Sequence, residues 1–190
     1  VQSTLDLVAA ARATGVRAFV YFSSVKALAD GDAGAATGGP VVLSSYGHSK
    51  RRAEQAVLNG DGVPHSVVLR PSLVYGPKPK GYLDLMIRAV RGGWFPPLPE
   101  LGNGRSMIHR DDLVEAALLC AFDPGASGNA YVVTDGTPYS TRQVYEYILS
   151  ALGRKPPSWT LPVGMLRAAA RAGDAIRKIR GRRLLFDSDL

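Results

Sequence analysis

The segment RAFVYFSS, residues 17–24, decides the fold class because it has the pattern of a β-strand buried on both faces. It is rich in Val, Phe and Tyr and shows little alternation between polar and apolar residues, as is typical of a strand inside a parallel sheet. A helical pattern over residues 4–14 precedes it, and Gly15 is expected to end that helix. A helix, a short turn and a buried strand predict a parallel α/β architecture.

The same order of elements continues after this strand. Residues 29–40 are mostly Gly, Ala and Asp, which predicts a loop. A helix is predicted to begin near Ser44 or Ser45, either of which can cap it, and to end at about Leu58. A second buried strand follows over residues 65–69. Helix, strand, loop, helix and strand is the order of a Rossmann-like, doubly wound parallel sheet, of which this chain would hold the C-terminal half.

Beyond Gly81 the pattern changes to that of a smaller α+β region. The expected elements are a helix to about Val90, a strand around Met107, a helix over 111–122, a strand over 131–133 and a helix over 141–152. We therefore predict a partial dinucleotide-binding domain with the catalytic residues over 1–78. Residues 79–190 are predicted to be mainly substrate-binding, with some segments returning to the first part.

Composition argues against several classes of protein. The 190 residues are 46% hydrophobic, which suits an ordinary folded chain, and apolar stretches such as 113–122 are too short to span a bilayer. The single cysteine, Cys120, excludes an internal disulfide and favours a cytoplasmic location, with a buried structural thiol as its expected role. No secretory signal is visible at the start of the chain.

The net charge of +7 has a plain structural explanation. Basic residues crowd residues 167–183, where apolar residues at helical spacing predict an amphipathic helix with a basic solvent-facing side. A nucleic-acid or lipid contact is the alternative, but no aromatic residues for base stacking are interleaved with the charges, so no nucleic-acid partner is predicted. No metal site is predicted either, because Asp111 and Asp112 are better placed to cap the following helix.

Tyr46 and Lys50 are the strongest candidates for chemistry. They are four residues apart at the start of a predicted helix, so their side chains share one face, one turn apart. A phenol with an ordinary pKa of about 10 is a poor base at neutral pH. A nearby ammonium group stabilises the phenolate form, which makes the pair suitable for general acid/base catalysis. The spacing alone is common by chance, and its structural alternative is an exposed helix pair.

Two further segments are predicted to meet this pair. Ser23 and Ser24 stand at the carboxyl end of the first buried strand, which is the edge where open α/β sheets bind ligands. A hydroxyl there can bridge a substrate oxygen and the tyrosine. The second strand ends in RPSLVYGP, residues 70–77, which predicts a rigid turn at the same edge. The sequence thus predicts one crevice formed by three elements.

Three motifs together resemble the extended short-chain dehydrogenase/reductases, in the NAD-dependent epimerase/dehydratase branch. They are FVYFSS at 19–24, YGHSK at 46–50 and LRPSLVYGP at 69–77. The resemblance implies that Tyr46 is the acid/base, that Lys50 holds the cofactor ribose and activates the tyrosine, and that Ser24 orients the substrate or relays the proton. It also implies that NAD is the cofactor, with NADP as the alternative, and that the nicotinamide end is lined by Phe22, Ser23, Pro71 and Leu73.

The resemblance also indicates the substrate side. The segment GNGRSMIHRDDL, residues 102–113, is similar to the family segment whose arginine contacts the diphosphate of a nucleotide sugar, a role that would fall on Arg105. Where epimerases of this branch often carry an asparagine that contacts the sugar pyrophosphate, this chain has Tyr82. His109 is interpreted as a packed or capping residue. Family members often dimerise through the tyrosine-bearing helix and its neighbour, so a homodimer is also expected.

One family feature is not found in the sequence. The Gly-rich phosphate-binding fingerprint is absent, and residues 31–39 do not replace it because they open no apolar helix. The resemblance therefore predicts a fragment that lacks roughly three βα units, ~90 residues, before Val1 and a further segment after Leu190. Such a fragment is expected to be inactive by itself.

Three hypotheses follow for the activity. The first is an epimerase or dehydratase similar to UDP-glucose 4-epimerase, in which Tyr46 takes a hydroxyl proton while hydride passes transiently to NAD. The second is a dehydrogenase or reductase of a keto sugar or sterol-like alcohol that uses the same residues. The third, from another class, is a non-catalytic dinucleotide-binding sensor. Stoichiometric consumption of NADH or NADPH separates the second hypothesis from the first.

Overall fold

The structure is a computed structural model that describes residues 2–28, 44–59, 63–79 and 81–165. It confirms an α/β fold and divides the chain into two compact units. The first unit holds residues 1–74 and 107–135, and the second holds residues 75–106 and 136–190. The predicted loop at 29–40 and the basic segment at 167–183 lie outside the described residues. Within the described part, no helix has the length and apolar character needed to cross a membrane.

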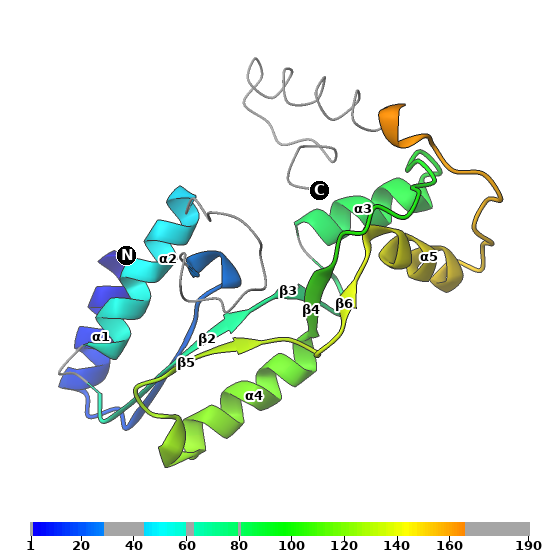
Figure 1. Ribbon diagram of the computed structural model, residues 1–190. Coiled ribbons are helices and arrows are strands. Elements are labelled where there is room, and N and C mark those ends of the chain that lie inside the picture. Colours follow the sequence, from blue (N-terminus) through cyan, green and yellow to red (C-terminus); the bar gives the residue numbers. More distant parts are fainter. Residues whose placement is uncertain (1, 29–43, 60–62, 80, 166–190) are drawn as a thin grey trace. The chain divides into compact units, whose positions relative to one another are not determined.

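A parallel sheet forms the centre of the first unit. Its strands are β1 (Ala18–Phe22), β2 (His65–Pro71) and β5 (Ala130–Val133), in the order β1-β2-β5. Val20 pairs with Val67, and Val68 pairs with Ala130. Helices α1 (Gln2–Ala13) and α2 (Ser45–Leu58) cover one face of the sheet, and α4 (Arg110–Phe122) covers the other (Figure 1). Helices on both faces of a parallel sheet are the doubly wound arrangement that the sequence predicted.

The strands of this sheet are buried to different degrees. Val67, Val68 and Leu69 of the central strand β2 are completely buried. In β1, by contrast, residues 18–21 are only partly buried, and Phe22 is 44% exposed. The prediction that residues 17–23 are buried on both faces was therefore wrong. The reason is that β1 is an edge strand of the sheet within the described residues, so it has a neighbouring strand on one side only.

Helix α2 begins where a serine side chain satisfies a free backbone N–H. Ser44 has extended backbone angles, and its hydroxyl oxygen accepts a hydrogen bond of 3.1 Å from the N–H of Gly47. Of the two serines predicted as caps, Ser44 is thus the cap and Ser45 is the first helical residue. This cap fixes where the helix starts, and it therefore fixes the positions of Tyr46 and Lys50 on its first two turns.

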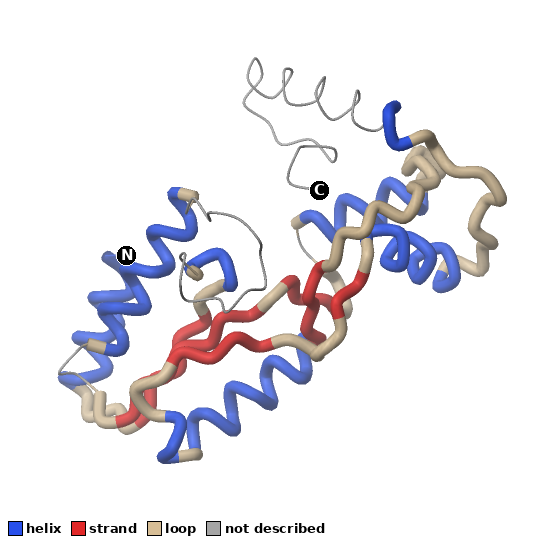
Figure 2. The backbone as a smooth tube through the Cα atoms, in the orientation of Figure 1, coloured by secondary structure: helices blue, strands red, loops and turns tan. Residues whose placement is uncertain are grey.

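The second unit contains helices α3 (Tyr82–Arg91) and α5 (Thr141–Ala151), which pack against each other. Its hydrophobic core includes Met86 and Ala89 of α3 and Tyr145 of α5, and the ring of Phe95 stacks on that of Tyr145 at 5.4 Å between centroids. Three short strands, β3 (Leu73–Tyr75), β4 (Arg105–His109) and β6 (Pro138–Tyr139), are ordered β3-β4-β6. Figure 2 shows how short these strands are beside the helices.

The chain leaves the first unit in β3 and returns to it in β4. The returning part holds α4, the 3-10 helix η2 (Pro124–Ala126) and β5, which pairs with β2 rather than with a strand of a separate sheet. The core of the first unit accordingly joins distant segments, with Val67 and Leu69 packed against Ile108 and Leu113. Whether residues 79–190 are mainly substrate-binding stays a prediction.

Candidate active site

The first part of the candidate site follows β1. Ser23 is buried, and Ser24 comes next with extended backbone angles. The Ser24 hydroxyl oxygen accepts a 3.2 Å hydrogen bond from the N–H of Lys26. Ser24 is thereby the N-cap of the 3-10 helix η1 (Val25–Ala27). Because one lone pair of Ser24 Oγ is used by the cap, its O–H stays able to donate to another oxygen. The local fold therefore sets the direction of this hydroxyl.

The second part comes from α2, where Lys50 reaches back to β1. Its Nζ donates a 2.9 Å hydrogen bond to the carbonyl oxygen of Phe22, and it lies 5.9 Å from the centroid of the Tyr46 ring. The same ammonium lies 5.0 Å from the centroid of the Tyr21 ring. The two predicted catalytic side chains of α2 thus point in the same direction, and the lysine ties them to the end of the strand that carries Ser24. Tyr46 is half exposed, at 51%, so a substrate can reach it.

A buried ion pair, which the sequence reasoning missed, joins α2 to β2. Arg70 donates from Nε to Glu54 Oε1 at 3.0 Å and from a terminal nitrogen to Glu54 Oε2 at 2.7 Å, and Glu54 is only 2% exposed. This two-pronged geometry is the strongest form of an arginine–carboxylate contact. The sequence did contain a signal that Glu54 faces the site, because Glu54 follows Lys50 by four residues and so lies on the same side of the helix.

The third part is the end of β2, which passes through Pro71 to Ser72 and Leu73. The hydroxyls of Ser23 and Ser72 are both buried, and neither has a hydrogen-bond partner among the described residues. Buried polar atoms normally have partners, so two such hydroxyls at the carboxyl ends of adjacent parallel strands suit a polar ligand. Ser72 was not among the predicted site residues. Together with Phe22 and Pro71, these hydroxyls fit the mixed polar and apolar surface of a nicotinamide ring.

Of the predicted substrate residues, Tyr82 and Arg105 lie in the second unit, and Ser24 lies in the first. The guanidinium carbon of Arg105 lies 5.1 Å from the centroid of the Tyr82 ring, which is within the range of a cation–π contact. Nearby, the side-chain amide of Asn103 bonds the hydroxyl and the backbone N–H of Thr141, at 2.7 and 3.2 Å. The glycine-rich loop that leads to Arg105 is therefore fastened to the start of α5. The structure brings Tyr82 and Arg105 together, and their roles in binding stay predictions.

The residues around His109 have structural roles. The ring of His109 accepts a 3.3 Å hydrogen bond from the N–H of Asp111, so His109 caps α4, in agreement with its interpretation as a packed or capping residue. The expectation that Asp111 and Asp112 cap this helix was wrong, because both lie within its first turn. There, Asp111 forms an ion pair with Arg110 at 2.9 Å. The negative charges of Asp111 and Asp112 also interact favourably with the partial positive charge at the N-terminus of the helix.

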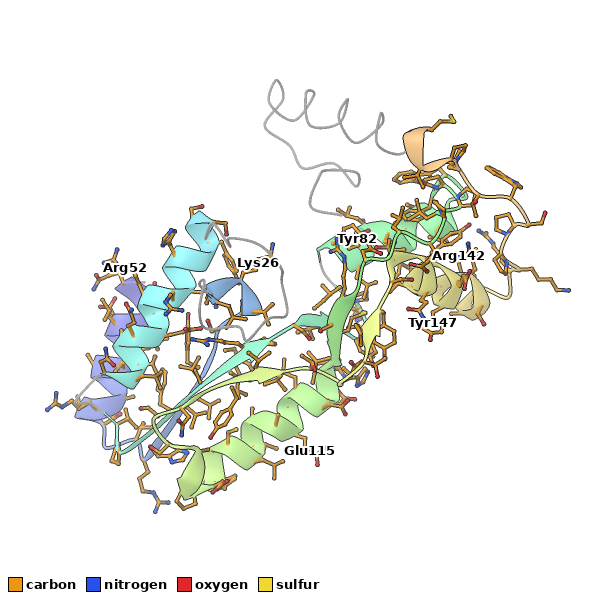
Figure 3. All side chains as sticks on the ribbon, viewed as in Figure 1. Lys26, Arg52, Tyr82, Glu115, Arg142 and Tyr147 are labelled. Carbon is orange, nitrogen blue, oxygen red and sulfur yellow. The ribbon has the colours of Figure 1, made fainter. Side chains whose placement is uncertain are left out.

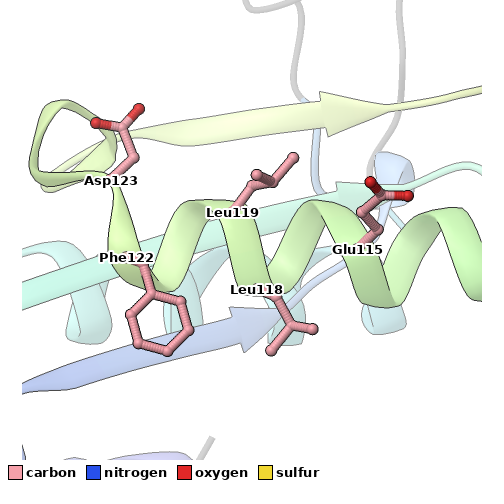
Figure 4. Close-up of a pocket in the computed structure, with 5 residues that line it drawn as sticks. All are labelled: Glu115, Leu118, Leu119, Phe122 and Asp123. Atoms are coloured by element: carbon pink, nitrogen blue, oxygen red, sulfur yellow. The ribbon is translucent and has the colours of Figure 1, made fainter.

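A pocket at the end of α4 lies apart from these groups. Figure 4 shows its lining residues, which are Glu115, Leu118, Leu119, Phe122 and Asp123. None of them is a predicted site residue, and the surface is mainly apolar, so we do not assign the chemistry to it. Cys120 on this helix is partly exposed rather than buried as predicted. Within the described ranges, no cluster of three or more His, Cys, Asp or Glu could hold a metal ion.

A known protein family matches most of this chain. The model of the NAD dependent epimerase/dehydratase family matches residues 1–134. The chain belongs to this family. As the sequence predicted, this epimerase/dehydratase family is NAD-dependent, and the match includes Ser24, Tyr46 and Lys50.

Individual proteins match this chain with about the same identity. UDP-glucose 4-epimerase of Vibrio cholerae is 31% identical over 84% of this chain and 50% of that protein. Human short-chain dehydrogenase/reductase family 42E member 1 is 31% identical over 72% of this chain and 39% of that protein. A ketoreductase of a farnesylated dihydroquinoline oxide from Stigmatella aurantiaca is 30% identical over 93% of this chain and 54% of that protein. The chain thus spans about half the length of these relatives.

Solved structures with similar coordinates show the same fold. MoeE5 in complex with UDP-glucose and NAD superimposes with a TM-score of 0.67 at 26% identity, over 82% of this chain and 55% of that chain. The structure of gox2253 gives a TM-score of 0.68 at 27% identity, over 98% of this chain and 58% of that chain. A dTDP-glucose 4,6-dehydratase of Bacillus anthracis, in complex with NAD, gives 0.64 at 25% identity, over 82% of this chain and 52% of that chain.

Proposed function

We propose that this chain supplies the acid/base site of an NAD-dependent epimerase or dehydratase that acts on a nucleotide sugar. The observation that carries the proposal is the position of Lys50, whose ammonium bonds the carbonyl of Phe22 and lies 5.9 Å from the Tyr46 ring centroid. The Lys50 side chain thus places its ammonium group beside both the Tyr46 phenol ring and the end of the parallel strand β1. This is the arrangement that proton exchange with a sugar hydroxyl at a sheet edge requires.

The electrostatics favour a tyrosine base. An ammonium group close to a phenolate favours the charged form by Coulomb attraction, and water screens this attraction at an exposed site. The hydrogen bond to Phe22 keeps the ammonium in place, so little of this stabilisation is lost to movement of the lysine chain. Tyr46 can then take the proton of a substrate hydroxyl and return it, while the Ser24 hydroxyl donates a hydrogen bond to the substrate oxygen.

The proposed site for the cofactor is at the carboxyl ends of β1 and β2. NAD, when bound, supplies a reversible hydride acceptor. Phe22, Ser23, Pro71 and Leu73 would line its nicotinamide end, to which we add Ser72, and Lys50 would hold the ribose. The unpartnered hydroxyls of Ser23 and Ser72 support this assignment because a carboxamide offers both donors and acceptors. The complexes of MoeE5 and of the Bacillus anthracis dehydratase with NAD support it as well.

The substrate assignment uses the second unit. Arg105 would bind the diphosphate, since a guanidinium group presents several donors in a fixed plane. Its contact with the Tyr82 ring would hold that plane in one orientation and place Tyr82 beside the substrate. UDP-glucose in the MoeE5 complex and the UDP-glucose 4-epimerase of Vibrio cholerae support a nucleotide sugar. The expected homodimer stays a prediction.

A second candidate function is net reduction of a ketone. It is favoured by the Stigmatella aurantiaca ketoreductase, which matches 93% of this chain at 30% identity. Ser24, Tyr46 and Lys50 would have the same roles, but the proton would pass from Tyr46 to the carbonyl oxygen in one direction. The two candidates differ in whether the cofactor is regenerated within each turnover.

The test uses the full-length natural protein with NAD and UDP-glucose. We expect UDP-galactose or a dehydrated keto sugar to form, as followed by proton NMR, with no net change in absorbance at the wavelength of NADH. Replacing Tyr46 with Phe should lower kcat by about 10²–10⁴-fold because the proton acceptor is lost. Stoichiometric NADH or NADPH consumption with a ketone would select the reductase, and unchanged turnover in Tyr46→Phe would rule out both enzymes.

A further inference from the structure

The 3-10 helix after Ser24 is held at both of its ends. At its start, Ser24 accepts the N–H of Lys26, and the N–H of Ala27 donates to the carbonyl of Ser24 at 2.9 Å. At its end, the carbonyl of Ala27 accepts a 3.2 Å hydrogen bond from Nη1 of Arg51. A carbonyl in the last turn of a helix has no N–H donor within that helix, and here Nη1 of Arg51 is the donor to the Ala27 carbonyl.

Arg51 lies next to Lys50 on α2. The two side chains donate hydrogen bonds to backbone carbonyls of residues before and after Ser24. Lys50 bonds the carbonyl of Phe22, two residues before Ser24, and Arg51 bonds that of Ala27, three residues after it. Ala27 itself is completely buried, and α2 packs against η1. The Ser24 segment is therefore tied to the tyrosine-bearing helix at two points by two adjacent cations.

We propose that Arg51 is a positioning residue that holds the Ser24 hydroxyl at a fixed position relative to the Tyr46 side chain. This inference rests on the proposed function, since it concerns how the serine reaches the substrate oxygen. Arg51 does not contact the reacting atoms. It acts through the 3-10 helix, because a shift at Ala27 is passed to Ser24 by the hydrogen bond between them. Misplacing a catalytic group by about 1 Å can lower a rate by about a hundredfold.

The neighbouring Arg52 provides a matched control. It has the same charge and lies on the same helix, but its side chain is exposed and points away from the strands, as Figure 3 shows. Replacing either arginine with Met removes one positive charge and leaves a side chain of similar length. Any general effect of charge or helix propensity should thus be shared by both variants. An effect specific to the Ser24 segment should occur in Arg51→Met only.

The kinetic test combines Arg51→Met with Ser24→Ala in the full-length protein. If Arg51 acts through Ser24, Arg51→Met lowers kcat about tenfold alone but less than about twofold in the Ser24→Ala background. The KM for the sugar nucleotide is expected to stay within about twofold, and Arg51→Lys to recover kcat to within about threefold because it keeps a donor. An equal loss of kcat in both backgrounds would show a merely structural role and overturn the inference.

A second readout does not depend on activity. Hydrogen exchange of a peptide covering residues 22–28 reports the N–H groups of Ala27 and Leu28, which close the 3-10 helix. Arg51→Met should speed this exchange about tenfold and Arg52→Met should leave it unchanged. Unchanged exchange in Arg51→Met would also overturn the inference. If Tyr46→Phe retains full activity while exchange still rises in Arg51→Met, the proposed function fails, but the contact of Arg51 with the turn is supported.

Discussion

At the residue scale, two contacts of Lys50 have different consequences. The hydrogen bond to the Phe22 carbonyl holds the ammonium at the end of β1, and under the proposed function the nearby Tyr46 ring is the group on which this charge acts. Spacing in the sequence was enough to predict the second contact, because residues four apart share a helix face. It could not predict the first, because a backbone carbonyl carries no sequence signal. The contact of Arg51 with Ala27 was invisible for the same reason.

Cys120 provides a test of burial at one residue. Partial burial raises the pKa of its thiol, and the negative charge of Asp123 raises it further. Since the thiolate is the reactive form, alkylation by iodoacetamide at pH 8 should be about tenfold slower in the folded protein than in urea. Mass spectrometry measures both rates, with Cys120→Ser as the unlabelled control. Equal rates in the two states would contradict this prediction.

Glu100 tests a hydrogen bond through its titration. The Ser140 hydroxyl donates to Glu100 Oε2 at 2.9 Å, and this bond, with the N–H groups of Gly102 and Leu101, lowers the pKa of the carboxyl. A carboxyl whose pKa is lowered by folding stabilises the fold above its unfolded pKa, and this contribution disappears as the pH falls through the folded pKa. In Ser140→Ala, the Glu100 carboxyl should titrate at a higher pH than in the wild type, as measured by carbon-13 NMR. Identical midpoints would contradict this assignment.

At the scale of elements, the described helices and the longer strands follow the sequence pattern closely. Helix α2 begins after one of the two predicted capping serines and ends at Leu58 as predicted, and β2 covers the predicted apolar run. The two short strands β3 and β6 were not predicted, since two or three residues show no periodicity. The pairing of β5 with β2 was not predicted either, because the partner of a strand depends on the path of the whole chain.

The Glu54–Arg70 pair should contribute strongly to the attachment of α2 to β2. Removing one partner of a buried ion pair leaves the other charge unpaired, so Glu54→Gln should lower the free energy of unfolding by about 3–5 kcal/mol. The double variant Glu54→Gln with Arg70→Met should lose less than Glu54→Gln alone, since no buried charge then stays unpaired. Urea unfolding followed by circular dichroism measures both. A double variant less stable than Glu54→Gln alone would contradict this account.

At the scale of the whole molecule, each compact unit has its own hydrophobic core. Leu69 is fully buried in the core of the first unit and Met86 in that of the second, so replacing either with Ala should cost about 2–5 kcal/mol. If the units open separately, Leu69→Ala speeds amide exchange in β2 and α4 only, and Met86→Ala speeds it in α3 and α5 only. Exchange that rises in both units after one substitution would show a single cooperative fold.

The apolar side of α4 affects how the protein behaves in concentrated solution. Leu118, Leu119 and Phe122 are 55%, 65% and 83% exposed, and they form much of the lining of the pocket in Figure 4. Water-exposed apolar side chains of this size promote self-association, and ammonium sulfate strengthens that tendency. Phe122→Lys should therefore raise the ammonium sulfate concentration at which the protein precipitates, whereas Glu115→Lys, a charge change on the same helix, should not. The most exposed ring of this helix would thus lower the salt concentration at which the purified chain leaves solution.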